Sequence, residues 1–331
     1  MNILVTGGAG YIGSHTTVAL IESGYNVIIA DNLSNSSIST KKNLETITNQ
    51  ELTFYNIDVA DNNALENVFS NHHIEGVIHF AGYKSVSESV EKPLYYYNNN
   101  LISTLTLLNV CEKFSVNKFV FSSSATVYGD NKPPLTEKML LSPTKNPYGE
   151  TKVMCERMLS DIAKSKEHFS VAILRYFNPV GAHESGLIGE APNGIPNNLM
   201  PFVSQVAKGK HKKLNIFGDD YQTLDGTGVR DYIHVVDLAI GHVAALDNLT
   251  NGVHYYNLGT GRGTSVLELV KAFERANDVE VPYDLMDRRP GDIAECYADV
   301  SKAEKELGWT AKRDIIEMCR DAWRFEKKHH I

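Results

Sequence analysis

Residues 2–15, "NILVTGGAGYIGSH", decide the fold that the rest of the chain has to match. The apolar run at residues 2–6 is typical of a buried strand, and the segment that follows residue 13 has the pattern of a helix. Between them lie Gly7, Gly10 and Gly13, which permit a tight turn and a close approach of a ligand to the backbone. The stretch therefore predicts a strand, a glycine turn and a helix whose N-terminus can bind the pyrophosphate of a dinucleotide.

Acidic residues at the ends of the next two expected strands indicate which dinucleotide this is. Asp31 follows the apolar run at residues 26–30, roughly 20 residues beyond the glycine turn. A carboxylate there accepts hydrogen bonds from both ribose hydroxyls and repels a 2′-phosphate, which favours NAD over NADP. Asp58, at the end of the third expected strand, is suited to an adenine contact.

Short β-rich runs alternate with helical patterns through the first half of the chain. The expected strands are residues 2–6, 26–30, 52–57, 76–80, 118–123 and 171–177. Their nearly continuous apolar character is typical of a parallel sheet that is buried on both faces. This alternation predicts an α/β fold with a doubly wound parallel sheet of the Rossmann type.

The composition changes at residue 178, where "NPVGAHESGLIGEAPNGIPNNLMP" (178–201) is rich in Gly, Pro and Asn. A loop of this length in a compact domain is usually functional or a linker. A helical pattern returns later, for example at residues 265–278. We expect residues 1–177 to form the NAD-binding domain and residues 178–331 a smaller mixed α/β substrate domain, with some segments returning to the first.

Composition excludes several classes of protein. The net charge is -8 and no basic stripe is present, which argues against nucleic-acid binding. The four cysteines are scattered without a C-x-x-C pair, so they indicate reduced cytoplasmic thiols and neither a disulfide framework nor a metal site. The N-terminus lacks the basic region of a signal peptide, and no apolar run reaches the ~18 residues of a membrane span. The histidine pairs at 72–73 and 329–330 are expected to lie on the solvated surface.

A serine, a tyrosine and a lysine occur in the order that dinucleotide chemistry requires. Ser124 follows the fifth expected strand, and Tyr148 and Lys152 are one turn apart on the next helix. The tyrosine–lysine spacing alone is more often ordinary helix packing, but the serine and the glycine turn favour catalysis. A nearby ammonium and a positively charged nicotinamide would lower the pKa of the phenol from about 10, so Tyr148 is the expected general base. Ser124 can hold the substrate hydroxyl, and Lys152 can also bind the nicotinamide ribose.

These features together resemble the extended short-chain dehydrogenase/reductases. Over nearly the whole chain, the resemblance is closer to the UDP-galactose (UDP-glucose) 4-epimerases of that family. It rests on "GGAGYIGSH" (7–15), "HFAGYKSVSES" (79–89), "NPYGETK" (146–152), "DGTGVRDYIHVVDLA" (225–239) and "RRPGD" (288–292), among other stretches. The resemblance implies a role in galactose metabolism. In the implied reaction, Tyr148 takes the proton of the sugar 4-hydroxyl while hydride moves to tightly bound NAD⁺, and the 4-keto sugar then takes hydride back on its other face.

The resemblance also implies binding residues. For NAD they are Gly7, Gly10, Tyr11, Ile12, Gly13, Asp31, Asn32, Leu33, Ser34, Asn35, Ser36, Asp58, Val59, Phe80, Ala81, Gly82, Tyr83, Lys84, Asn99, Ser124, Tyr148, Lys152 and Phe177. For the UDP-hexose substrate they are Ser124, Tyr148, Asn178, Asn198, Leu199, Asn215, Ile216, Phe217, Arg230, Arg289, Asp292 and Cys296. The two arginines supply charge for the pyrophosphate.

One position bears on the range of substrates. Cys296 stands where some family members carry a bulkier tyrosine against the C2 side of the sugar. The smaller side chain predicts that UDP-N-acetylglucosamine and its galacto epimer are also accepted. A packing difference without functional effect is the alternative.

Two other functions fit parts of the pattern. A nucleotide-sugar dehydratase of the same superfamily would carry acidic residues just after the serine, where this chain has Ala125 and Thr126. A non-catalytic redox sensor binds a dinucleotide on the same fold and needs no Tyr-x-x-x-Lys pattern. The family resemblance further implies a homodimer joined through helices near residues 93–114 and 147–165.

Overall fold

The computed structural model describes residues 1–331 apart from 193, 195, 197, 290–291 and 329–331. Within these residues, seven parallel strands form one sheet in the order β10-β6-β5-β4-β1-β2-β3. The strands are β1 (Asn2–Thr6), β2 (Asn26–Ala30), β3 (Thr53–Tyr55), β4 (Gly76–His79), β5 (Lys118–Ser124), β6 (Ser170–Tyr176) and β10 (Gly252–Leu258). The expected doubly wound parallel sheet is confirmed, and its strand order reverses at β1, the kind of point at which open α/β sheets bind ligands.

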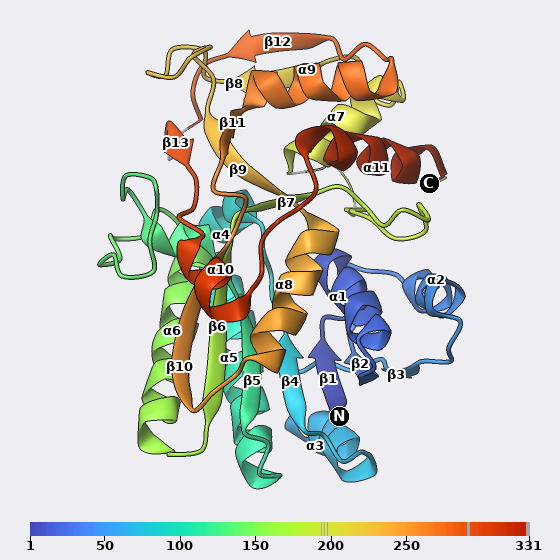
Figure 1. Ribbon diagram of the computed structural model, residues 1–331, viewed down its shortest axis with the longest axis vertical. Coiled ribbons are helices and arrows are strands. Elements are labelled where there is room, and N and C mark those ends of the chain that lie inside the picture. Colours follow the sequence, from blue (N-terminus) through green and yellow to red (C-terminus); the bar gives the residue numbers. More distant parts are fainter. Residues whose placement is uncertain (193, 195, 197, 290–291, 329–331) are drawn as a thin grey trace.

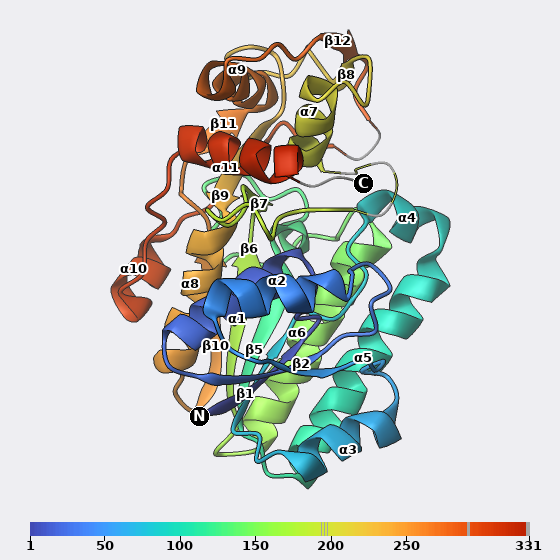
Figure 2. The same ribbon diagram turned by 90° about the vertical axis from the view of Figure 1, so that its right-hand side faces the viewer.

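The strands are buried on both faces because helices cover both. Ile3 and Val5 of β1 pack toward one helical layer and Leu4 toward the other, as the period of two requires. One layer contains α1 (Tyr11–Glu22), α2 (Ser39–Thr48) and α8 (Val235–Asp247). The opposite layer contains α3 (Asn62–Asn71), α5 (Pro93–Lys113) and α6 (Pro147–Ser165). Figure 2 shows the sheet between these layers.

Two expected strands are shorter in the structure than in the sequence pattern. β3 covers only Thr53–Tyr55, because it is an edge strand that pairs with β2 alone. β4 ends at His79, one residue before the expected boundary. β10 was not predicted. It comes from beyond residue 178 and adds a seventh strand beside β6.

The smaller C-terminal domain lies above the carboxyl ends of the large sheet (Figure 1). Its strands are β7 (Asn178–Val180), β8 (Leu214–Phe217), β9 (Val229–His234), β11 (Gly263–Ser265), β12 (Tyr283–Met286) and β13 (Glu295–Cys296). Its helices are α7 (Leu199–Ala207), α9 (Val266–Asn277) and α11 (Ile315–Lys328). Val203, Leu269, Phe273 and Met318 meet in its core. The remaining elements are α4 (Val86–Glu91), η1 (Ala125–Tyr128) and α10 (Ser301–Leu307).

The helix predicted near residues 265–278 is confirmed as α9, and its ends show why it forms there. Ser265 accepts a hydrogen bond from the backbone of Glu268, whose side chain accepts one from the backbone of Ser265, which is a capping box. Asp278 adopts a left-handed conformation just after the helix. Local capping therefore sets both boundaries.

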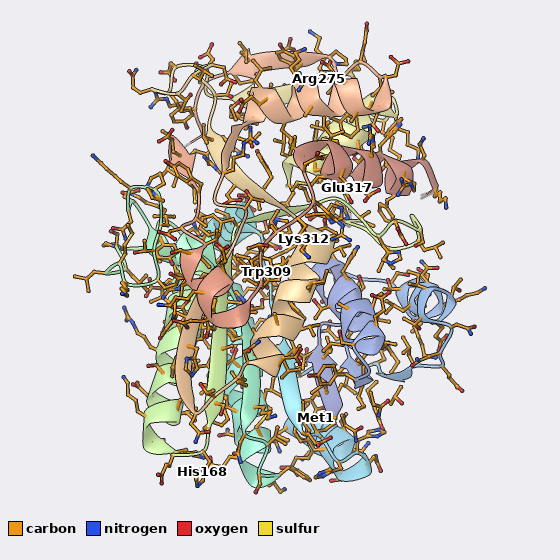
Figure 3. All side chains as sticks on the ribbon, in the orientation of Figure 1. Met1, His168, Arg275, Trp309, Lys312 and Glu317 are labelled. Atoms are coloured by element: carbon orange, nitrogen blue, oxygen red, sulfur yellow. The ribbon has the colours of Figure 1, made fainter. Side chains whose placement is uncertain are left out.

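A segment near the C-terminus connects the two domains through α8. The Trp309 indole donates a hydrogen bond to the carbonyl of Asp237 at 3.0 Å, and the Asp237 carboxylate accepts from the backbone of Lys312 at 2.9 Å. Figure 3 shows Trp309 and Lys312 beside α8. Because Asp237 is buried, these bonds hold the chain firmly on its way from α10 to α11.

Candidate active site

Nearly all segments expected to bind the cofactor follow the carboxyl end of a strand. Residues 7–13 follow β1, 31–36 follow β2, 58–59 come after β3, 80–84 follow β4, Ser124 ends β5 and Phe177 follows β6. Asn99 lies on α5, and Tyr148 and Lys152 lie on α6. Parallel strands place their carboxyl ends at one edge, so these residues gather at the edge that faces the smaller domain (Figure 1).

The glycine turn is packed so tightly that side chains would not fit. A Cβ on Gly7 would lie 2.8 Å from the backbone nitrogen of Ala81, and the φ of Gly7 is +69°. A Cβ on Gly13 would lie 2.2 Å from the carbonyl oxygen of Gly7. Only glycine therefore allows the turn to close on itself in front of α1, and a turn of this kind before a helix N-terminus fits the pyrophosphate of a dinucleotide.

Asp31 is engaged mainly within the protein. Its carboxylate accepts hydrogen bonds from the backbone of Ala9 at 3.0 Å and Leu33 at 2.9 Å, and from the Ser36 hydroxyl at 2.9 Å. A carboxylate has about four acceptor positions, so about one is left for a ligand. Binding of both ribose hydroxyls at Asp31 would require displacement of one protein bond. The next acidic residue, Asp58, accepts from the Asn32 side chain at 3.2 Å.

Ser124, Tyr148 and Lys152 converge at the end of β5. The Ser124 hydroxyl lies close enough to the Tyr148 phenol to lower its pKa. The Lys152 ammonium lies 5.9 Å from the centre of the Tyr148 ring and donates to the carbonyl of Ser122 at 2.7 Å. The hydroxyl, the phenol and the amine are therefore placed together in the way that the sequence order predicts.

Burial dominates the ionisation of this group. It raises the pKa of Tyr148 above its ordinary 10.0, and the nearby Ser124 hydroxyl lowers this pKa only in part. In the protein without a cofactor, desolvation therefore outweighs the other influences on the phenol's pKa. The predicted lowering, which combines the ammonium of Lys152 with an oxidised nicotinamide, stays a prediction. The positive charge of a nicotinamide ring remains the expected source of the lowering. Burial also lowers the pKa of Lys152 from 10.5 to about 8.

In the smaller domain, the expected substrate residues form two separate groups. Arg230 on β9 is the register partner of Cys296 on β13, and burial raises the pKa of this thiol to about 11. Arg289 lies 4.8 Å from the centre of the Phe217 ring and pairs with Asp292 at 3.1 Å. Each arginine therefore lies beside other residues of the expected set.

Other expected residues are placed differently. The side chains of Ile216 and Val59 are buried in the two domain cores, so only their backbone atoms can reach a ligand. Asn215 is exposed on β8, and Asn178 is exposed at the start of β7. Leu199 begins α7 and is partly buried against the core of the smaller domain.

Glu190 belongs to this region although the sequence analysis did not single it out. Its carboxylate pairs with Lys84 at 2.9 Å and accepts from Asn198 at 2.5 Å. It thus connects one residue of the expected cofactor set to one of the expected substrate set. Its position in the Gly- and Pro-rich loop was the available signal.

The described residues contain no group of three or more His, Cys, Asp or Glu side chains that could hold a metal ion. Within the same part of the chain, no helix has the length and apolar character needed to cross a membrane. The four cysteines are free thiols. His72 is half-buried and His73 is exposed, whereas His329 and His330 lie outside the described residues.

Comparisons with known proteins agree over almost the full length. A family model described as GDP-mannose 4,6 dehydratase matches residues 4–322. The UDP-glucose 4-epimerase of Bacillus subtilis (strain 168) is 59% identical over 332 residues, which cover 99% of this chain and 98% of the relative. The same enzyme from Pasteurella multocida (strain Pm70) is 57% identical over the same shares of the two chains.

A solved structure agrees equally well. The UDP-glucose 4-epimerase from Bifidobacterium longum, in complex with NAD⁺ and UDP, matches with a TM-score of 0.96 and 53% identity, covering 99% of this chain and 98% of that one. The dehydratase in the family model's description is not favoured by these relatives, and Ser124 is followed by Ala125 and Thr126, neither of which is acidic. The chain therefore belongs to the UDP-glucose 4-epimerase family of the extended short-chain dehydrogenase/reductases.

Proposed function

We propose that this protein inverts the configuration at C4 of UDP-galactose and UDP-glucose through a 4-keto sugar, with NAD as a tightly held cofactor. The observation that carries the proposal is the convergence of Ser124, Tyr148 and Lys152 at the carboxyl edge of the sheet, the edge that also carries the glycine turn after β1. Relatives at 59% and 53% identity are UDP-glucose 4-epimerases, and the second of them contains NAD⁺ and UDP.

Three side chains carry the proton chemistry. Tyr148 is the general base that takes the proton of the sugar 4-hydroxyl and later returns it. Ser124, whose hydroxyl lies near the phenol, orients the sugar 4-hydroxyl. Lys152 provides positive charge beside the phenol and binds the nicotinamide ribose. NAD, when bound, supplies the acceptor and donor of the hydride at C4.

The cofactor site is assigned to the residues at the carboxyl edge of the sheet. The glycine turn, the loop at residues 31–36, Asp58, Val59, the loop at residues 80–84, Asn99 and Phe177 would hold NAD. The support is their common placement beyond β1–β6 and the close backbone packing of Gly7 and Gly13. Residues 1–177 are proposed as the NAD-binding domain and residues 178–331 as the UDP-sugar domain, although β10 and α8 join the larger sheet and its covering layer.

The enzyme binds its substrate mainly through the UDP part. Arg230 and Arg289 would bind the pyrophosphate, with Asn178, Asn198, Leu199, Asn215, Ile216, Phe217 and Asp292 around the nucleotide and sugar. Binding energy from the UDP part, which is remote from C4, holds the substrate while the 4-keto hexose rotates to present its other face. The stacking of Arg289 on Phe217 supports a preformed pyrophosphate site.

The substrate range is proposed to include the N-acetylated UDP-hexoses. Cys296 is half-buried beside Arg230, and its side chain is far smaller than the tyrosine of some family members. Space beside C2 of the sugar would accommodate the acetamido group.

A homodimer and a cytoplasmic location complete the proposal. Leu94, Ile102 and Leu105 on α5 expose apolar side chains in the region expected to form the dimer, with exposed fractions of 82%, 41% and 43%. The four free thiols support a reducing compartment.

Incubation of purified protein with UDP-galactose, without added cofactor, tests the function. We expect UDP-glucose to form, since NAD is retained through purification. If no UDP-glucose formed even after NAD was added, the proposal would be refuted. If a 4-keto-6-deoxy sugar accumulated, the dehydratase would be the correct assignment.

A further inference from the structure

The side-chain amide of Asn100 holds the backbone of the loop that follows β4. This asparagine is 4% exposed and lies on α5. Its Oδ1 atom accepts from the backbone nitrogen of Tyr83 at 2.8 Å, and its Nδ2 atom donates to the carbonyl of Tyr83 at 3.1 Å. One side chain thus satisfies both backbone groups of Tyr83, as a neighbouring strand would. Oδ1 also lies 3.2 Å from where a Cβ of Gly82 would be, so the loop approaches closely.

The same amide reaches the backbone of Tyr148 through one hydroxyl. Nδ2 of Asn100 donates to Oγ1 of Thr151 at 3.0 Å, and Oγ1 of Thr151 lies 2.7 Å from the carbonyl of Tyr148. A hydroxyl has a single proton, and a carbonyl can only accept. Thr151 therefore accepts from Asn100 and donates to Tyr148, so the bridge has one direction. α5 and α6 pack side by side where this bridge forms (Figure 2).

A second series of hydrogen bonds connects the backbone of Asn100 to β4 and β1. Oγ1 of Thr104 donates to the carbonyl of Asn100 at 2.9 Å, so it accepts from Nε2 of His79 at 3.2 Å. The other ring nitrogen of His79 then accepts from the hydroxyl of Thr6 at 2.7 Å. Burial lowers the pKa of His79 to about 3, which keeps the ring neutral as this assignment requires. This series of hydrogen bonds ends at the loop at residues 80–84, because the backbone of Ala81 donates to the hydroxyl of Thr6 at 3.4 Å.

We infer that Asn100 and Thr151 are positioning residues that set the separation between the loop at residues 80–84 and the phenol of Tyr148. The inference rests on the proposed function, in which that loop binds NAD and Tyr148 transfers the proton. Asn100 and Thr151 act through the backbone of Tyr83 and Tyr148. Loss of the bridge lets the phenol and the cofactor move relative to each other, which lowers the rate of turnover more than the binding of the substrate.

Two variants of Thr151 separate the hydroxyl from the packing around it. Thr151→Val has nearly the same shape but can neither accept from Asn100 nor donate to Tyr148, whereas Thr151→Ser retains both bonds. We expect Thr151→Val, which loses both buried hydrogen bonds, to lower kcat by about tenfold, with KM for UDP-galactose close to wild type. Thr151→Ser is expected to restore kcat. Equal kcat values in these two variants would overturn the inference.

Asn100→Ala tests whether the hydrogen bonds of Asn100 to the backbone of Tyr83 keep the loop at residues 80–84 in place to bind NAD. Asn257→Ala is the matched control. Asn257 is also buried and also holds backbone atoms, since Nδ2 donates to the carbonyls of Leu135 at 2.7 Å and Asp299 at 3.3 Å. We expect both variants to lower the unfolding temperature. Only Asn100→Ala should lower the NAD content of the purified protein, measured after acid release. Equal NAD content in the two variants would contradict the inference.

The outcomes distinguish the inference from the function on which it rests. Wild-type protein without turnover refutes the proposed function, whereas wild-type turnover with unchanged kcat in Thr151→Val refutes the bridge alone. Kinetics are measured well below the unfolding temperature of every variant, so that a loss of folded protein cannot imitate a loss of kcat.

Discussion

The ammonium of Lys152 is fixed beside the ring of Tyr148. Its Nζ atom lies 5.9 Å from the ring centre and is held by the carbonyl of Ser122 at 2.7 Å. The amine also lies 4.8 Å from the centre of the Phe121 ring, so it is held from two directions. Its effect on the phenol is therefore the effect of a fixed positive charge in a buried site.

The pH dependence of turnover should report this charge. Burial lowers the pKa of Lys152 to about 8, so the amine is protonated below that pH and loses its charge as the pH rises through it. We expect kcat to fall above pH 8 or so, because the neutral amine no longer favours phenolate. Lys152→Arg keeps its charge at all these pH values and should lack the alkaline fall, although its turnover is lower. An alkaline limb that is identical in both proteins would contradict this role.

Removal of the charge should be far more damaging than its displacement. Lys152→Met fills a similar volume without a cation, and we expect kcat to fall by roughly 10²–10⁴, the usual contribution of assisted proton transfer. Stopped assays of UDP-glucose formation at neutral pH measure the loss. Wild-type turnover in this variant would remove Lys152 from the account.

The glycine turn offers a separate prediction about cofactor retention. In Gly13→Ala, the new Cβ would lie 2.2 Å from the carbonyl of Gly7, so the backbone before α1 must move. We expect the purified variant to contain much less NAD than wild type. Gly24→Ala, just beyond the C-terminal end of the same helix, is the control: the φ of Gly24 is +84°, but no atom lies within 4 Å of the new Cβ. This control should lose about 1 kcal/mol of stability and keep its NAD. If both variants retained NAD equally, the turn would not be the cofactor site.

The sheet could be predicted from the sequence because its signals are local. The strands at residues 2–6 and 26–30 were correct to the residue, since apolar runs bounded by Gly, Asn or Asp specify them. β10 was missed, although "GVHYYNL" has the composition of a strand. β10 is separated from β6 by about 75 residues, so its pairing with β6 depends on how the intervening segments fold.

Within the site, the residue types were predictable and their environments were not. Ser124, Tyr148 and Lys152 follow from the order of motifs, but the pKa of Tyr148 depends on burial by segments that the motifs do not specify. Asn100 and Thr151 carry no charge and lie 51 residues apart. Their contact exists only because α5 and α6 pack side by side, which no pattern of spacing reveals.

A buried ion pair below the site should be important for stability. Arg175 donates to Glu156 through Nε at 2.9 Å and through a terminal nitrogen at 2.6 Å, and both side chains are nearly fully buried. Glu156→Gln leaves the buried guanidinium without a counter-charge, so we expect a loss of about 3–5 kcal/mol in the free energy of unfolding. Urea denaturation measures it. A double replacement, Glu156→Leu with Arg175→Met, should cost less than the sum of the two single changes, and a single-variant loss below about 1 kcal/mol would contradict the prediction.

Cys296 should control the range of substrates. Cys296→Tyr places a large ring where we propose that the smaller cysteine leaves space for the acetamido group, so we expect turnover of UDP-N-acetylglucosamine to fall by about 10–200-fold relative to that of UDP-glucose. Cys296→Ser is the size-matched control and should keep both activities. Undiminished N-acetyl turnover in the tyrosine variant would show that this position does not limit the sugar.

The assignment of Tyr148 as the base is tested most directly by Tyr148→Phe. This change removes one hydroxyl and preserves the ring that packs beside Lys152. In parallel, the NAD content of the purified variant and its conversion of UDP-galactose to UDP-glucose are measured against wild type. We predict wild-type NAD content with turnover reduced by roughly 10² or more. Conversion at the wild-type rate would contradict the account, because the proton of the 4-hydroxyl would then leave by another route.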